Sequence, residues 1–369
     1  MTLLDGIAAR VIDTPRLRVN ILERTGDAPE TPLEHTIVFL HAHVASSLFW
    51  QEIMQDLPGD IRPIAIDLRG FGDTESAPVD ATRGVRDFSD DLRATLETLG
   101  LGAVHLVGWS LGASVAMQYA LEHPVLSLTL QAPISPYGFG GTRRDGTRLT
   151  DDDAGCGAAA ANPDLVRRIA AGDTSDDAST SPRSVFRSHY VSADYDSDSE
   201  DVWVEAMLST STAPGDYPGD AVPSSHWPGK AAGVTGVLNA LAPRHLDLSG
   251  IVGLVPKPPI LWIHGTADVV VSDASSQDLN HLGRLGVITG WPGAELAPAQ
   301  EMVSQTRDVL EAYRAAGGEV TELELEGAGY AAHLERPGGF RRAVLEHIGY
   351  LGHPNPALPT EAIILSSSD

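Results

Sequence analysis

The most constraining feature of this sequence is a regular alternation of short apolar runs with segments of helical periodicity. Within residues 85–99, for example, Phe88, Leu92 and Leu96 recur at the spacing of one helical face. Runs that are apolar on both faces are typical of parallel strands buried between two layers of helices. Strands are predicted at 35–40, 62–68, 103–109, 126–133, 258–265 and 319–327, and a hairpin or pair of edge strands at 9–24. We therefore expect an α/β fold with a mostly parallel central sheet.

This alternation stops near residue 136 and resumes at residue 258. A crossover between parallel strands needs only about a dozen residues, so roughly 120 residues here must form an inserted lid or cap. The inserted sequence contains acidic, glycine-rich and proline-rich stretches. The predicted division is 1–136 for the first part of the core, 137–256 for the lid, 257–351 for the second part of the core and 352–369 for a C-terminal tail.

The strongest chemical motif is GWSLG, Gly108 to Gly112, between a predicted strand and a predicted helix. A nucleophile elbow needs this arrangement, because a strained turn exposes the serine while neighbouring backbones come into contact. Glycines on both sides of the serine relieve that crowding. The short pattern alone is weakly specific, but its place between strand and helix favours Ser110 as a nucleophile over an incidental turn.

The chain around this motif resembles the α/β-hydrolase superfamily, and the resemblance covers nearly all of the sequence outside the lid and the tail. It implies an α/β-hydrolase fold in which the oxyanion loop, the nucleophile, the acid and the histidine follow one another along the chain. A serine nucleophile, rather than aspartate, argues against the epoxide-hydrolase and dehalogenase branches. The implied chemistry is acyl transfer from an ester, a lactone or a similar carbonyl compound.

The segment FLHAHVASSLFW, residues 39–50, is similar to the oxyanion loop of that superfamily. The resemblance assigns one oxyanion donor to the backbone N–H of His43 and the second to that of Leu111. His41 is expected to form structural hydrogen bonds in this loop, and Trp109, next to the serine, is grouped with the substrate-binding residues. Ala42 stands where the superfamily usually has glycine, and its methyl group is expected to move the loop.

Two further segments match the superfamily. DLRGFGDTESAP, residues 67–78, is similar to its Asp-x-Arg-Gly-x-Gly-x-Ser loop, which has a structural role. HGTADVVV, residues 264–271, resembles the turn that carries the catalytic acid, which assigns the acid to Asp268. The alternative for Asp268 is a helix cap or turn cap.

The last motif departs from the superfamily. Its pattern there is Gly-His-x-x-His-x-Glu-x-Pro, with the first histidine catalytic. In GYAAHLERP, residues 329–337, Tyr330 takes that position and His333 matches the second histidine. An ordinary phenol has a pKa near 10, so roughly one in a thousand is ionised at neutral pH, which makes tyrosine a poor base. Three residues span about one helical turn, so His333 is a candidate base; the alternative is a supporting histidine beside the site.

Three functions remain open from the sequence. In the first, Ser110, His333 and Asp268 hydrolyse a small to medium-sized organic ester or lactone, in a lid pocket built with Tyr190, Tyr195, Trp203 and Trp227. In the second, Tyr330 donates a hydrogen bond in a non-hydrolytic catalyst such as a cyclase or lyase. In the third, the protein binds a ligand without turnover, or is an inactivated variant.

Charge and cysteine content limit the expected partners and location. The net charge of −25 repels phosphate backbones and anionic membrane surfaces, so neither nucleic acid nor membrane is expected. The single cysteine, Cys156, excludes an intrachain disulfide and fits a reducing cytoplasm. A small-molecule substrate is expected, and the tail could pack on a second subunit to give a homodimer.

No cofactor or metal is expected from the motifs. The sequence has no GxGxxG or phosphate loop for a nucleotide and no HExxH pair for zinc. Residues 194–205 carry acidic side chains at positions 1, 3, 5 and 12 of a calcium-loop count, but Ser199 stands where the sixth position requires glycine. A solvated lid surface is the expectation there.

Overall fold

The computed structural model describes residues 1–25 and 35–352 of the chain. At its centre is an eight-stranded sheet in the order β1-β2-β4-β3-β5-β6-β9-β10. β2 pairs antiparallel with both β1 and β4, and the other neighbouring strands are parallel. The strands are β1 (Ile7–Asp13), β2 (Arg18–Arg24), β3 (His35–Leu40), β4 (Ile61–Ile66), β5 (His105–Trp109), β6 (Ser127–Gln131), β9 (Ile260–Gly265) and β10 (Val320–Leu325). The predicted α/β fold with a mostly parallel sheet is confirmed.

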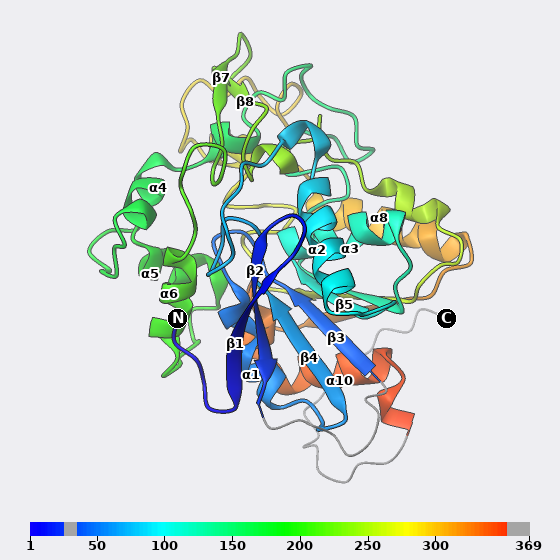
Figure 1. Ribbon diagram of the computed structural model, residues 1–369. Coiled ribbons are helices and arrows are strands. Elements are labelled where there is room, and N and C mark those ends of the chain that lie inside the picture. The colour runs from blue at the N-terminus through cyan, green and yellow to red at the C-terminus, as the bar shows by residue number, and fades with distance from the viewer. Residues whose placement is uncertain (26–34, 353–369) are drawn as a thin grey trace.

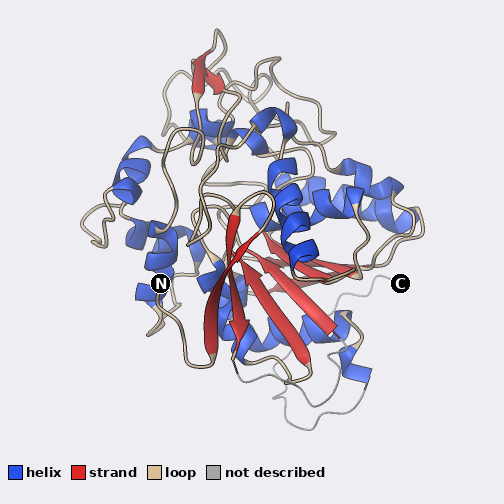
Figure 2. Cartoon of the chain, viewed as in Figure 1, coloured by secondary structure: helices blue, strands red, loops and turns tan. Residues whose placement is uncertain are grey.

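Helices cover both faces of the sheet (Figures 1 and 2). On one face lie α2 (Arg86–Thr98), α3 (Leu111–Glu122) and α8 (Met302–Ala315), and on the other α1 (Gln51–Gln55) and α10 (Pro337–His347). Phe88, Leu92 and Leu96 of α2 are buried, as the periodicity predicts. β5 and β9 are buried along their whole length, because helices cover them on both sides.

The segment between β6 and β9 is one long insertion. It contains α4 (Pro163–Ala170), α5 (Pro182–Val185), the π-helical turn η4 (Phe186–Tyr190), α6 (Glu200–Leu208) and the hairpin of β7 (Ala221–Pro223) with β8 (Lys230–Ala232). In Figure 1, α4 to α6 lie beside the sheet and the hairpin lies at the top. The predicted lid falls within this insertion, whereas the predicted tail, apart from Gly352, lies outside the described residues.

A second excursion packs against the insertion. It connects β9 to α8, includes α7 (Leu279–Arg284), and accepts a hydrogen bond of 2.9 Å from Trp227 Nε1 at the carbonyl oxygen of Thr289. Residues 194–205, the alternative calcium loop, do not form one continuous loop, because α6 begins at Glu200. Glu205, its twelfth residue, lies 3.1 Å from the N-terminal ammonium of Met1.

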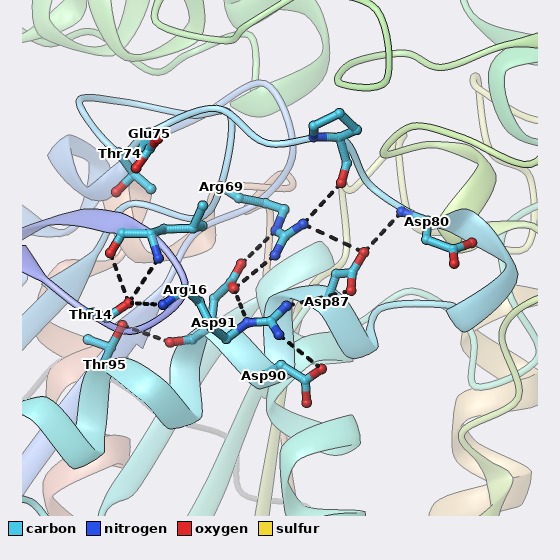
Figure 3. A network of polar contacts seen from close by, with 12 residues as sticks. Thr14, Arg16, Arg69, Thr74, Glu75, Asp80, Asp87, Asp90, Asp91 and Thr95 are labelled. Carbon is cyan, nitrogen blue, oxygen red and sulfur yellow. Dashed lines mark hydrogen bonds and ion pairs between the residues drawn. The ribbon is translucent and has the colours of Figure 1, made fainter.

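The loop after β4 fixes the neighbouring elements through buried ion pairs. Asp67 accepts a hydrogen bond of 2.7 Å from the backbone N–H of Ser47, which anchors the loop after β3. Arg69 donates two hydrogen bonds, of 2.6 and 2.8 Å, to Asp91 of α2 (Figure 3). Arg16, from the turn between β1 and β2, donates a third of 2.7 Å to the same carboxylate. The loop therefore holds the edge strands, α2 and the loop after β3 in one network.

Candidate active site

Ser110 lies on a sharp turn between β5 and α3. Its φ of 54° and ψ of −108° are unusual for a residue with a side chain, and only 1% of its surface is exposed. A Cβ atom on Gly108 would lie 2.4 Å from the carbonyl oxygen of Gly112, and one on Gly112 would lie 2.2 Å from that of Leu40. The two glycines of GWSLG are therefore required by close backbone contacts on both sides of the serine.

Asp268 lies in the turn after β9, where one of its oxygens is held by the backbone. Oδ1 accepts hydrogen bonds of 2.7 Å from the N–H of Val270 and 2.9 Å from that of Val271. Oδ2 is buried and has no hydrogen-bond partner among the described residues. Burial raises the pKa of Asp268 to about 7, although the two backbone N–H groups oppose the shift. Oδ2 is therefore free to accept a hydrogen bond from a further group.

Tyr330 lies in the loop after β10 with 1% of its surface exposed. Its ring centre is 4.9 Å from that of Trp109 and 5.4 Å from that of Tyr190. Burial raises the pKa of the phenol well above its ordinary value, the nearby Ser110 hydroxyl opposes this shift, and the charge of Asp268 adds to it. The phenol is thus close to both groups, yet it makes no hydrogen bond of normal geometry to a described residue.

Three buried polar atoms without partners therefore occur together: Ser110 Oγ, Tyr330 Oη and Asp268 Oδ2. A buried polar atom that makes no hydrogen bond costs about 1–3 kcal/mol. Most buried polar atoms in folded proteins have partners, so three such atoms in one place indicate a site built for a bound molecule.

His333 is fully buried and bonded elsewhere. Its ring lies over Trp50 at a centre distance of 4.3 Å. Its Nε2 lies 3.2 Å from the carbonyl oxygen of Phe49, and its Nδ1 lies 2.9 Å from Nε2 of Gln131. Because a carbonyl oxygen can only accept, these partners indicate the tautomer that donates from Nε2 and accepts at Nδ1. Burial lowers its pKa to about 3, so the ring is neutral. Both ring nitrogens are thus engaged, and His333 makes no hydrogen bond to Ser110. This arrangement differs from the sequence-based prediction that His333 is a candidate base for Ser110.

Two residues that support the site, Gln131 and Glu335, were not predicted from the sequence. Gln131, the last residue of β6, holds the His333 ring. Glu335 accepts hydrogen bonds of 2.6 Å from the N–H of Gly329 and 3.0 Å from that of Ser192. Glu335 thereby ties the loop of Tyr330 to the insertion. Its place as the glutamate of the Gly-His-x-x-His-x-Glu-x-Pro pattern was the sequence signal that could have predicted this role.

The predicted oxyanion loop follows β3 directly. His41 is fully buried, donates from Nδ1 to the carbonyl oxygen of Ala42 at 2.7 Å, and accepts at Nε2 from the N–H of Leu68 at 3.0 Å. These are structural contacts of the kind expected for it. The second predicted donor, the N–H of Leu111, belongs to the first residue of α3, and the first N–H groups of a helix have no acceptor within the helix.

The insertion contacts the predicted oxyanion loop through Tyr190. Its hydroxyl donates to the carbonyl oxygen of Val44 at 2.9 Å and lies 3.3 Å from that of His43. Val44 has a φ of 48°, an uncommon conformation for a β-branched residue. The His43 ring stacks on Tyr217 at a centre distance of 6.2 Å, and burial lowers its pKa to about 4. The position of this loop thus depends on aromatic residues of the insertion.

A cavity of about 580 Å³ borders Tyr330, whereas Ser110 and Asp268 do not belong to its wall. Tyr330, His43 and Val270 line it from the loops after the strands, and Tyr190 and Tyr217 line it from the insertion. This volume suits a small to medium-sized organic molecule. Of the aromatic residues predicted to form the pocket, Tyr190 does so, whereas Trp203 is buried against Phe49 at a ring distance of 5.3 Å.

Within residues 1–25 and 35–352, two groups of side chains lie close enough to share a metal ion: Asp151, Asp152 and His226, and His264, Glu322 and Glu324. In this range, none of the four predicted catalytic residues belongs to a group of His, Cys, Asp or Glu side chains close enough to share a metal ion. No helix in the same range is long and apolar enough to cross a membrane.

Residues 35–296, from β3 to the segment before α8, match the family described as the alpha/beta hydrolase fold. The chain belongs to this family. Over 106 residues it is 35% identical to the probable lysophospholipase BODYGUARD 4 of Arabidopsis thaliana, a match that covers 27% of this chain and 25% of that protein. Over 88 residues it is 36% identical to 2-succinyl-6-hydroxy-2,4-cyclohexadiene-1-carboxylate synthase of Enterobacter sp. (strain 638), covering 24% of this chain and 33% of that protein.

These matches leave most of each relative uncovered: the chain spans about a quarter of the length of the BODYGUARD proteins. Among solved structures, the enol-lactonase from Burkholderia xenovorans LB400 is similar, with a TM-score of 0.55 and 16% identity. That superposition covers 92% of this chain and 100% of the lactonase chain, and it shows a common fold.

Proposed function

We propose that this α/β-hydrolase acts on the carbonyl group of a small to medium-sized organic compound, such as an ester or a lactone, with Ser110 as the nucleophile. The observation that carries the proposal is the group of three buried, unpartnered atoms on Ser110, Tyr330 and Asp268, of which Tyr330 lines the cavity. The strained turn at Ser110 supports it, because a nucleophile elbow requires that backbone conformation and because it leaves the N–H of Leu111 free for an oxyanion.

In this proposal, Tyr330 and Asp268 together take the place of a catalytic histidine. When Ser110 Oγ bonds to the carbonyl carbon, its proton passes to Tyr330 Oη, and the phenol proton passes to Asp268 Oδ2. The phenol remains neutral before and after the step, which its raised pKa requires. An acid with a pKa of about 7 is well matched to accepting and returning a proton near neutral pH. His333 has a structural role.

A non-hydrolytic reaction is the second candidate, and the protonated state of Tyr330 favours it. A phenol that keeps its proton over the physiological pH range is a better hydrogen-bond donor than base. It would donate to a substrate oxygen while Asp268 removes a proton from carbon, as in a lyase or cyclase. A ligand-binding protein without turnover is the third possibility. The small-molecule substrate, the cytoplasmic location and the homodimer remain predictions from the sequence.

Labelling by a fluorophosphonate probe tests the proposal, with Ser110→Ala as the control. We expect native protein to be labelled faster than the Ser110→Ala variant, with a rate that rises through an inflection near pH 7. That inflection should disappear in Asp268→Asn, because Asp268 is the group expected to titrate there. Labelling no faster than in Ser110→Ala would refute the serine mechanism and turn attention to the non-hydrolytic reaction or to ligand binding.

A further inference from the structure

Lysine is rare in this chain, and its two lysines have different surroundings. The sequence has 50 acidic residues against 25 lysines and arginines, of which Lys230 and Lys257 are the lysines. The ammonium of Lys257 donates to the carbonyl oxygen of Leu254 at 3.0 Å and lies 4.9 Å above the ring of Tyr313. Lys230 lines the cavity, and its ammonium has no hydrogen bond or ion pair with any residue of the described ranges.

Among the described residues, the cavity wall carries no other formal charge. None of the aspartates, glutamates and arginines of the described ranges lines it. Two histidines do, His43 and His189, but burial lowers the pKa of both, to about 4 for His43. Lys230 is therefore the one formal charge of the described cavity wall at neutral pH. In a chain with a net charge of −25, a cavity that carries a lone positive charge is unexpected by composition.

Backbone contacts on both sides hold the strand that carries Lys230. β8 pairs antiparallel with β7, and Lys230 lies opposite Pro223. On its other side, the carbonyl oxygen of Lys230 accepts a hydrogen bond of 2.8 Å from the N–H of Gly155. Lys230 is exposed, whereas Tyr330 on the same cavity is buried. The cavity wall thus contains an exposed cation, Lys230, and a buried residue, Tyr330, whose phenol has no partner among the described residues.

We propose that Lys230 binds a carboxylate of the substrate while the substrate's carbonyl group reaches Ser110; this inference rests on the proposed function of the site. A single ammonium balances a single negative charge, which favours a monocarboxylate over a phosphate dianion, whose recognition commonly involves an arginine fork or several donors. A cationic substrate would meet no counter-charge on the described wall. The substrate class is therefore a carbonyl compound that carries one carboxylate.

Binding of two uncleaved, nearly isosteric ligands tests this assignment. Glutaric acid mono-butylamide carries a carboxylate, and the corresponding diamide is neutral. Each is titrated by calorimetry into the native full-length protein, Lys230→Met and Lys230→Arg, in low salt and in 0.5 M NaCl. We expect native protein to bind the acid at least about fivefold more tightly than the diamide, the gain of an ion pair of about 1 kcal/mol. The preference should shrink in high salt.

The variants separate the charge from the shape of the side chain. The preference for the acid should vanish in Lys230→Met, which keeps the length, and persist in Lys230→Arg, which keeps the charge. An equal preference in native protein and Lys230→Met would overturn the proposal, as would no binding of either ligand to native protein. Neither ligand needs to be cleaved, so the fluorophosphonate experiment reports on the serine mechanism separately.

Discussion

Replacing Tyr330 by histidine is expected to turn the site into an ordinary catalytic triad. The substitution places an imidazole in the space beside Ser110 Oγ and Asp268 Oδ2, both of which have no partner in the native protein. The free oxygen of Asp268 can accept the Nδ1–H of that imidazole, which leaves Nε2 to accept the proton of the serine. The residues on either side of the missing histidine are thus already in place.

The expected gain follows from the protonation states. At pH 7 fewer than about one phenol in a thousand is ionised at its ordinary pKa, and burial and the charge of Asp268 reduce that fraction further. A histidine with a pKa near 6.5 is mostly the free base at pH 7.5. General-base catalysis contributes about 10²–10⁴-fold, or roughly 3–5 kcal/mol of the barrier. The native relay through Tyr330 to Asp268 already supplies part of that contribution, so labelling of Ser110 should accelerate by up to about 100-fold.

The assay is the fluorophosphonate labelling rate at pH 7.5 and its dependence on pH. Tyr330→His should lose activity below an inflection near pH 6–7, as the imidazole becomes protonated. Tyr330→Phe, which removes only the hydroxyl, is the matched control and should label more slowly than native protein. If Tyr330→His is folded and labels no faster than native protein, then Tyr330 does not occupy the position of the base, and the argument from the three unpartnered atoms fails.

Two further substitutions test the roles of the neighbouring groups. Asp268→Asn should gain stability over native protein as the pH rises from about 4 to about 7. Over that range native protein must ionise a buried carboxyl whose pKa is near 4 in the unfolded chain and about 7 in the folded one. In urea unfolding the difference in the free energy of unfolding should approach about 4 kcal/mol, and a difference that does not vary with pH contradicts the prediction. His333→Ala should lower the free energy of unfolding by about 3 kcal/mol, since it empties the space beside Trp50 and removes the partner of Gln131. The folded variant should still be labelled at Ser110 within about threefold of native protein; a folded variant that is not labelled would make His333 the base.

The features that were predictable are those fixed by residues close together in the chain. The strand and helix pattern is a local periodicity, so β3, β5, β9 and α2 lie where the sequence placed them. The turn at Ser110 is local too, since the contacts that forbid a side chain at Gly108 come from Gly112 and Ala113. The turn at Asp268 is closed by backbone groups two and three residues further on.

The pattern failed where a distant residue supplies the partner. Asp91 does not belong to the apolar stripe of Phe88, Leu92 and Leu96 on α2, yet it is buried, because Arg69 and Arg16 come from other elements to neutralise it (Figure 3). His333 is one turn from Tyr330 in the sequence, but its partners are Gln131 and Phe49, 202 and 284 residues away. No local spacing carries information about those contacts.

The sequence by itself determined the layered α/β architecture, the strained turn that presents Ser110 and the turn that holds Asp268, because backbone sterics and short-range periodicity decide each of them. Only the tertiary structure decided which groups lack partners and which are neutralised. Packing engages both nitrogens of His333, leaves Tyr330 beside Ser110 and Asp268, and brings Lys230 to the cavity that Tyr330 lines. Desolvation and long-range pairing act through space, so the chemistry of this site is set by the folded chain rather than by the order of its residues.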